Sequence, residues 1–186
     1  MESTKLNIST IDGKQFYVAV RDLLSAPVEA IVNPANSHLA HGGGLAAEIE
    51  RSAGQAFTQE CDDYIRDNGP IPTTRAAATG AGFLPYKNVI HAVGPKMGSG
   101  DEAVKIAKTV TNVLSAAERL SIKSIAFPAI SSGIYQVPLE TCFSGFIKAV
   151  PWYWDKRPNS CIEEIWLCLF KDDYDLFQRF YHSLKR

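Results

Sequence analysis

Residues 30–45 read AIVNPANSHLAHGGGL, and this stretch decides the fold. The apolar run Ala30 to Val32 predicts a buried strand, which Asn33-Pro34 ends because the residue before a proline is held extended. The glycines at 42–44 precede a segment from Leu45 to about Arg66 in which apolar residues recur every four positions, as on the buried face of a helix. A strand, a glycine-rich loop and a helix in this order predict an α/β fold.

Strands and helices alternate on both sides of this stretch. Before it, the turn signal Asp12-Gly13 joins two alternating segments, Lys5 to Ser9 and Gln15 to Val20. Asn68-Gly69-Pro70 marks the end of the helix that begins at Leu45. The elements expected after it are strands at Ala76 to Ala81 and Asn88 to Val93, a helix at Asp101 to Arg119 with Val104 on its apolar side, a buried strand at Ser124 to Ile130, a helix at Leu139 to Val150, a strand at Glu164 to Phe170 and a helix at Tyr174 to Leu184.

The composition is that of one ordinary domain. Of 186 residues, 46% are hydrophobic and 21% are charged, and a chain of this length buries about 70% of its unfolded surface without metals or disulfides. We therefore expect a single domain over residues 1–186, either complete or cut from a longer protein, and a monomer. The formal charge of -1 excludes general binding to duplex nucleic acid, because no long-range field recruits a polyanion. Any phosphate must be recognised by local backbone geometry.

The cysteines and histidines form no metal pattern. Cys61, Cys142, Cys161 and Cys168 contain no C-x-x-C pair, and His38 and His41 have no third ligand at a zinc-like spacing, so neither a metal nor a cofactor is expected. No segment approaches the roughly 18 apolar residues of a membrane span, and the N-terminus has no signal-like pattern. These features favour the cytoplasm or the nucleus and no contact with a membrane.

Two loops follow buried strands and carry small or polar residues. The first, residues 33–45, holds two asparagines and a histidine beside the three glycines, where unpaired N–H groups at a helix N-terminus suit a phosphate or a ribose. The second, PAISSGIY from Pro128 to Tyr135, can form a nest of N–H groups for a diphosphate. Either loop alone can be an ordinary turn. Because ligands of α/β sheets gather beyond the carboxyl ends of strands, the pair predicts a cradle for one elongated ligand.

Three other features have two interpretations each. Asp22 can accept hydrogen bonds from an exocyclic amine such as that of adenine, or it can cap a helix. Phe170 can stack on a base or lie in the core. The aromatic run Trp152 to Trp154 can form a partner surface, although we favour a place in the core around a helix end. His91, within an apolar strand, is expected to be a hydrogen-bonded core residue.

Five segments, in order, resemble the macrodomain family over nearly the whole chain from Gln15 to Tyr181. They are Arg21-Asp22-Leu23, Asn33 to Asn36, His41 to Gly44, Val89 to Pro95 and Pro128 to Tyr135. The chain looks most like the first macrodomains of multi-macrodomain poly-ADP-ribose polymerases and like coronavirus macrodomains, in which H-G-G-G begins five residues after an asparagine, as His41 follows Asn36. The resemblance implies a three-layer α/β/α fold with a mixed sheet of six or seven strands.

The resemblance also implies a site for ADP-ribose. Asp22 would hold the adenine amine, Asn36 would hold the distal ribose, and the two loops would bind the phosphates, while His41 would fix the loop and the sugar near the scissile bond. The catalytic residues implied are Asn36, His41 and Gly43. The ligand-binding residues implied are Asp22, Leu23, Ala35, Asn36, Gly42, Gly43, Gly44, Leu45, Ser131, Ser132, Gly133, Ile134, Tyr135 and Phe170.

The activity that the resemblance implies is metal-independent hydrolysis of mono-ADP-ribose from acidic side chains, with ADP-ribose and mono-ADP-ribosylated proteins as partners. Three residues depart from the family pattern: Ala46 stands where one hydrolase subgroup has an aspartate, Pro34 where alanine is commoner, and Gln136 where glycine is frequent. The missing carboxylate favours an alternative, a reader module that binds ADP-ribosylated proteins without turnover, whereas Asn36 with His41 favours the hydrolase. A deacetylase of acetylated ADP-ribose would need the same pocket.

Overall fold

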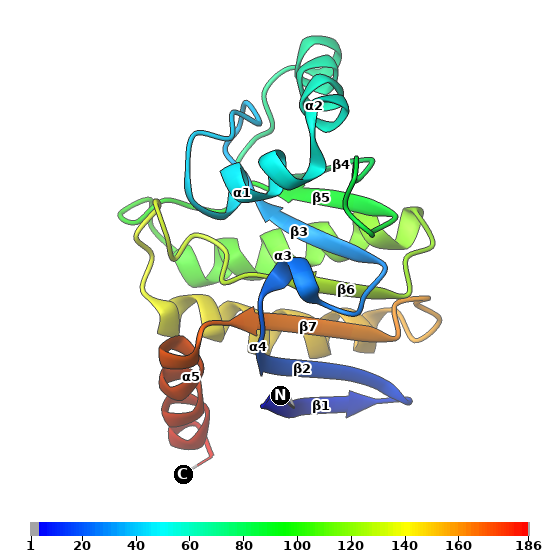
Figure 1. Cartoon of the computed structure of the whole chain (residues 1–186). Helices are drawn as coiled ribbons and strands as arrows, with labels where there is room; N and C mark the ends of the chain where they lie inside the picture. The colour runs from blue at the N-terminus through cyan, green and yellow to red at the C-terminus, as the bar shows by residue number, and fades with distance from the viewer. Residues whose placement is uncertain (1–3, 186) are drawn as a thin grey trace.

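The computed structural model describes residues 4–185, which form a seven-stranded sheet with helices on both faces (Figure 1). The strands are β1 (Lys5–Ile11), β2 (Lys14–Val20), β3 (Ala30–Pro34), β4 (Ala76–Thr79), β5 (Asn88–Ala92), β6 (Ser124–Phe127) and β7 (Glu164–Leu169). The helices are the short 3-10 helix η1 (Leu23–Ser25), α1 (Gly44–Ala53), α2 (Gln55–Asn68), α3 (Glu102–Arg119), α4 (Leu139–Lys156) and α5 (Lys171–Ser183).

The sheet is mixed, with the strand order β1-β2-β7-β6-β3-β5-β4. The five inner strands from β2 to β5 run parallel, whereas β1 and β4 pair antiparallel at the two edges. The seven-stranded mixed sheet between helical layers confirms the fold class implied by the resemblance. The parallel strands bring their carboxyl ends, and therefore the loops that follow them, to one edge of the sheet.

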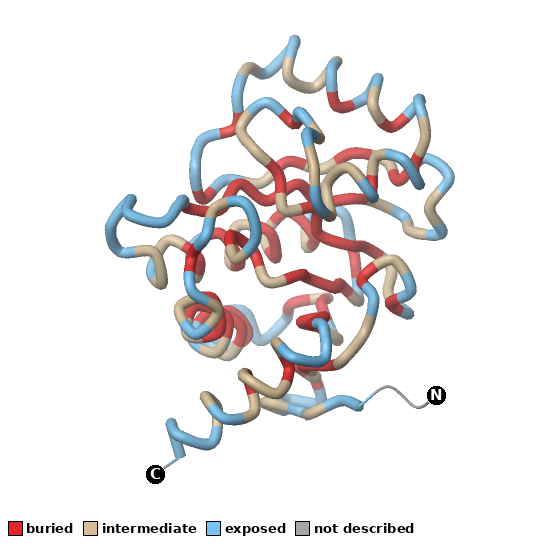
Figure 2. Tube along the Cα trace, turned by 60° about the vertical axis from the view of Figure 1, so that its left-hand side comes forward, coloured by how far each residue is buried: buried red, intermediate tan, exposed pale blue. Residues whose placement is uncertain are grey.

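Each face of the sheet has its own hydrophobic core. Along β3, Ala30 and Val32 pack in the core that α3, α4 and α5 cover, whereas Ile31 packs in the core that α1 and α2 cover. All three side chains are fully buried. Burial on both faces explains why this strand is apolar at consecutive positions. Figure 2 shows the buried positions concentrated along the strands in the middle of the molecule.

The single helix expected from Leu45 to Arg66 is wrong, because the structure has two helices joined at Gly54. Gly54 has φ +85°, a left-handed conformation that cannot continue a helix, and a Cβ there would lie 2.7 Å from the Phe83 ring. Its N–H donates to the carbonyl of Glu50, which ends α1. The four-residue apolar repeat crosses this break because α1 and α2 share one core.

Helix α4 continues through Pro151 to Lys156, although the sequence predicts an end at Val150. Tyr153 and Trp154 are almost wholly buried, and their polar atoms are paired: the Tyr153 hydroxyl donates to Glu118 at 2.6 Å and Trp154 Nε1 donates to the carbonyl of Ile162 at 3.0 Å. The interpretation of the run Trp152 to Trp154 as core residues is confirmed for these two aromatics and wrong for Trp152, which is 51% exposed. These anchors explain why the helix survives the loss of one N–H donor at the proline.

Other differences concern helix and strand ends or single residues. Val104 is 67% exposed on α3, so its placement on the apolar side was wrong. Strand β6 ends at Phe127 rather than at Ile130, because the next residue, Pro128, has no N–H to donate to a neighbouring strand. Helix α5 begins at Lys171, three residues earlier than expected. Within residues 4–185, no helix is both long enough and apolar enough to cross a membrane.

Candidate functional site

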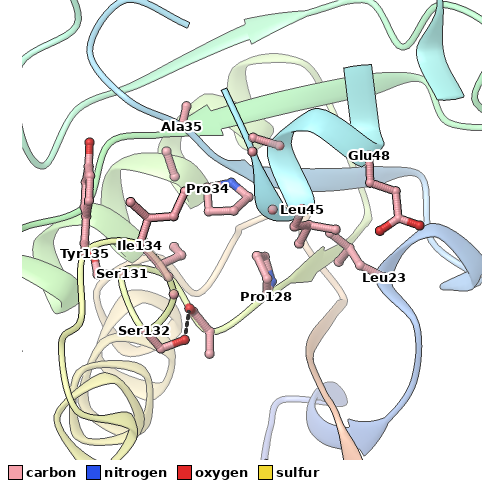
Figure 3. Close-up of a pocket in the computed structure, with 18 of the residues that line it drawn as sticks. Leu23, Pro34, Ala35, Leu45, Glu48, Pro128, Ser131, Ser132, Ile134 and Tyr135 are labelled. Carbon is pink, nitrogen blue, oxygen red and sulfur yellow. Dashed lines mark hydrogen bonds between the residues drawn. The ribbon is translucent and has the colours of Figure 1, made fainter. Parts of the chain in front are cut away.

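A cavity of about 630 Å³ opens at the carboxyl ends of the parallel strands. Its wall is formed by residues that follow β2, β3, β5, β6 and β7 and by the first turns of α1 (Figure 3). All of the ligand-binding residues implied by the resemblance line this one cavity, from Asp22 and Leu23 to Phe170. The two loops singled out from the sequence therefore face a common space.

The glycine loop leads into the N-terminus of α1. Gly43 precedes the helix, and no side chain caps the first N–H groups. A Cβ built on Gly43 would lie 3.9 Å from Cδ1 of Ile134, which belongs to the second loop. The two loops thus approach each other to within van der Waals contact of a side chain. Uncapped N–H groups at a helix N-terminus favour an anion at this position.

The second loop, Ser131 to Tyr135, is held by its own hydrogen bonds. Its Ser132 hydroxyl donates to the carbonyl of Ala129 at 2.8 Å, and Val137 N donates to the carbonyl of Ser131 at 3.0 Å. Behind the loop, a Cβ on Gly94 would clash with Ser131 Oγ and lie 2.6 Å from Cγ2 of Ile130. Only a glycine allows this close approach, so the position of the loop depends on Gly94.

Asn36 uses most of its side chain to hold its own loop. Its Oδ1 accepts hydrogen bonds from the N–H groups of His38 and Ala40, both at 3.1 Å, and its Nδ2 donates to the carbonyl of Ala40 at 2.6 Å. Asn36 also lines the cavity. Since an amide nitrogen carries two hydrogens, one N–H of Asn36 remains for a ligand.

His41 lies behind the glycine loop and does not line the cavity. Its ring centroid is 5.6 Å from that of Phe57 and 6.1 Å from that of His91, and its Nδ1 is 3.5 Å from Nδ2 of Asn33. Burial lowers the pKa of His41 below its ordinary value, against the opposing fields of Glu50 and Asp62. The structure therefore places this imidazole where it can support the loop.

His91 packs against His41 and Phe57 and is fully buried, as expected of a hydrogen-bonded core residue. Its Nε2 lies 3.0 Å from Oγ1 of Thr79, whose hydroxyl hydrogen is donated to the carbonyl of Gly80. Thr79 therefore accepts from Nε2–H, which leaves Nδ1 to accept from Nδ2 of Asn33 at 3.1 Å. Burial lowers the pKa of His91 to about 3, so the ring is neutral.

Asp22 and Leu23 follow β2 and Phe170 follows the neighbouring strand β7, so these residues come to the cavity from adjacent strands. Asp22 is the N-cap of η1, and its Oδ1 accepts from Leu24 N at 3.1 Å, so the capping interpretation is confirmed for one oxygen while the residue also lines the cavity. Phe170 is 80% exposed, which excludes the core interpretation and leaves a ring face open to a ligand.

The motifs missed two acidic residues that line the cavity, Glu48 and Asp173. Glu48 stands three residues after Leu45 on α1, and Asp173 stands three residues after Phe170. Side chains three apart share one face of a helix, so this spacing from a predicted site residue was a usable signal. Over residues 4–185, no group of three or more His, Cys, Asp or Glu side chains is placed to hold a metal ion.

Comparisons with known proteins agree with this geometry. The family model described as "Macro domain" matches residues 32–145. An uncharacterised protein of Saccharolobus solfataricus is 39% identical over 173 residues, which cover 92% of this chain and 95% of that protein. The human protein mono-ADP-ribosyltransferase PARP14 is 38% identical over 151 residues, which cover 78% of this chain but only 8% of that protein.

Solved structures give the same result. The Oceanobacillus iheyensis macrodomain solved with ADP superposes with a TM-score of 0.87 at 25% identity, covering 99% of this chain and 98% of that one. The Trypanosoma brucei macrodomain solved in complex with ADP-ribose shares the fold, with a TM-score of 0.80 at 23% identity over 93% of this chain and 72% of that one. With its family match, its relatives and its seven-stranded fold in agreement, the chain belongs to the macrodomain family.

Proposed function

We propose that this chain binds ADP-ribose in the cavity, with the adenine between Asp22 and Phe170 and the diphosphate between the two loops. The approach of the Ile134 side chain to Gly43 is the observation that carries this proposal, because it shows that the two loops meet at the cavity that both line. The cavity volume of about 630 Å³ is in the range of small-molecule sites. The ADP found in the Oceanobacillus iheyensis macrodomain supports the same ligand class.

The charge of the lining residues supports a backbone-made phosphate site. Asp22, Glu48 and Asp173 are acidic, and Arg21 is the one basic residue among the lining residues described. The Arg21 guanidinium donates to the carbonyl of Ser25 at 3.0 Å. The phosphates of the ligand would therefore be bound by peptide N–H groups of the two loops and by the N-terminus of α1.

The reaction that we assign to the site is hydrolysis of the ester between ADP-ribose and an acidic side chain. A water held between the ligand's own phosphate and the distal ribose attacks the anomeric carbon, the bond from that carbon to the ester oxygen breaks, and the bond electrons leave with the carboxylate of the modified protein. The proton of the water passes to the phosphate and then to solvent. A carboxylate is a stable leaving group, so this step needs no protein acid.

Positioning would supply most of the rate enhancement in such a site. Correct placement of two reacting groups can lower a barrier by about 7 to 11 kcal/mol. The remaining N–H of Asn36 would orient the distal ribose, and His41 would act as a positioning residue that supports the glycine loop from behind. Gly43 would admit the ligand close to the backbone.

A second function, a reader of mono-ADP-ribosylated proteins, is favoured by a different observation. Ala46 lines the cavity where a carboxylate base would stand, and the imidazole of His41 lies outside the cavity. A pocket without a base near Asn36 can bind its ligand without turnover.

One experiment separates the two functions. A protein automodified with glutamate-linked mono-ADP-ribose is incubated with the wild-type chain, with Asn36→Ala and with the matched control Asn159→Ala, whose asparagine lies on an exposed loop. Release of label by the wild type and the control, and not by Asn36→Ala, supports the hydrolase. If all three capture the modified protein and leave the label in place, the reader is correct. If none binds ADP-ribose, both functions are wrong.

A further inference from the structure

We propose that Glu48 sets the base specificity of the cavity by accepting, together with Asp22, the two hydrogens of an adenine exocyclic amine. This inference rests on the proposed binding of ADP-ribose and adds a residue that none of the sequence motifs contains. Glu48 lies on α1 and lines the cavity with Asp22 and Leu23. In Figure 3 its carboxyl group lies toward Leu23, on the opposite side of the view from Ser132 and Tyr135.

The position of Glu48 on α1 aims it at this cavity. Leu45 and Glu48 are three residues apart in the helix and both line the cavity, whereas Ile49 and Ala53, further along α1, are buried and anchor the helix in the core. Glu48 has one ion pair in the structure, with Arg51 at 4.0 Å, and the two side chains are 50% and 78% exposed. An exposed pair of this length contributes little, so the carboxylate can turn to a ligand at small cost.

Asp22 alone cannot satisfy an exocyclic amine. Its Oδ1 already accepts the Leu24 N–H, and one carboxylate can face only one of the two N–H bonds of an exocyclic amine, because these bonds point in different directions. The amine of adenine carries two hydrogens, and a hydrogen bond to a carboxylate is stronger than one to a neutral acceptor. Glu48 also lines the cavity, its carboxyl group lies toward Leu23 in Figure 3, and it supplies the second acceptor.

The carboxylates of Asp22 and Glu48 would together discriminate strongly against a base that carries a carbonyl in place of the amine. Hypoxanthine presents an acceptor where adenine presents two donors, so both carboxylates would face an oxygen. A site built to bind a donor rejects an analogue that lacks it, because acceptors that the bound base covers lose their partner. Glu48 should therefore widen the preference for adenine over hypoxanthine.

The experiment measures the ratio of two dissociation constants, that for inosine diphosphate ribose over that for ADP-ribose, rather than one affinity. A carboxylate also repels the phosphates of any nucleotide, and this repulsion cancels when two ligands of equal charge are compared. Calorimetric dissociation constants are measured for ADP-ribose and inosine diphosphate ribose with the wild type, Glu48→Gln, Glu48→Ala and the control Glu163→Gln. Glu163 is exposed next to the first residue of β7, at the opposite end of that strand from the cavity.

In both Glu48 variants we expect the ratio of the two dissociation constants, which expresses the preference for adenine, to fall about tenfold. This change corresponds to one hydrogen bond to a charged group. Glu48→Gln and Glu48→Ala should reduce this ratio by similar amounts, because the glutamine amide can accept from the adenine amine or donate to the hypoxanthine carbonyl and so no longer distinguishes them. A preference that stays at the wild-type value in both variants, with ADP-ribose still bound, overturns the role of Glu48 and leaves the proposed function intact. A wild type that binds neither ligand overturns the proposed function first, and this inference with it.

Discussion

The side-chain amide nitrogen of Asn33 lies 3.1 Å from Nδ1 of His91, so a side chain near the end of β3 is hydrogen-bonded to β5 directly behind the glycine loop. The same nitrogen lies 3.5 Å from Nδ1 of His41 at the start of that loop. Asn33 and His91 are both fully buried. The loop that faces the cavity is therefore backed by a neutral, hydrogen-bonded cluster inside the core.

Asn33→Leu is expected to destabilise the fold by about 1 to 3 kcal/mol, because the change keeps the side-chain volume but leaves Nδ1 of His91 buried without a donor. Urea unfolding at pH 7 measures the loss. Asn159→Ala, on an exposed loop, should change the stability by no more than about 0.5 kcal/mol. Equal stability of the two variants would show that the hydrogen bond to His91 contributes nothing.

The buried histidine should also make stability depend on pH. The pKa of His91 is lowered to about 3 in the folded chain from an ordinary value of 6.5, so between these pH values the unfolded state binds more protons. Stability should then fall as pH falls from about 6.5 toward 3, by at most about 1.4 kcal/mol per pH unit from this residue. Urea midpoints at pH 7, 6 and 5 measure the slope. His91→Gln removes the titrating group and should flatten it, and a slope as steep in that variant would assign it to other groups.

Asp22 has two roles that one variant can separate. Asp22→Asn keeps an oxygen that can accept the Leu24 N–H, so η1 stays capped, but its amide cannot accept an adenine amine from the ligand. We expect the affinity for ADP-ribose to fall by about 1 to 3 kcal/mol while the thermal midpoint hardly changes. Calorimetry and thermal unfolding measure the two effects. Unchanged affinity would remove Asp22 from the adenine site.

Gly94→Ala tests the dependence of the second loop on close packing. The new Cβ would clash with Ser131 Oγ and lie 2.6 Å from Cγ2 of Ile130, so the loop from Ser131 to Tyr135 must move. ADP-ribose affinity should fall at least about tenfold, because the N–H groups of the loop would no longer point toward the phosphates of the ligand. Adding Ser131→Gly removes the hydroxyl and suits the φ of +71° at that position, and it should restore part of the affinity. No recovery would mean that Ile130 alone causes the clash.

The sequence was informative wherever one physical signal dominated. The apolar run at β3 predicted a buried strand, and the structure confirms it, since Ala30 and Ile31 pack into opposite cores. The two small-residue loops predicted a shared space, and both line the cavity. In each case a local pattern and the position after a parallel strand pointed the same way.

Other features depended on contacts that no local pattern contains. The break at Gly54 follows from a backbone conformation and from the Phe83 ring above it, while the apolar repeat runs through the break unchanged. The persistence of α4 beyond Pro151 depends on partners of Tyr153 and Trp154 that are distant in the chain or follow the helix. Glu48 was missed because an acid on an amphipathic helix looks like an ordinary solvent-facing residue until the cavity beside it is known.

The acidic side chains around the cavity, with the one arginine already engaged by a carbonyl, have a consequence for how this pocket can diverge. Where peptide groups bind a phosphate, a point mutation to any residue but proline leaves the donor itself in place, because every other amino acid brings the same N–H. Descendants of such a chain can exchange base-reading residues one at a time and stay competent for pyrophosphate. The preference for a nucleobase can then change during evolution, while phosphate binding by the backbone is retained.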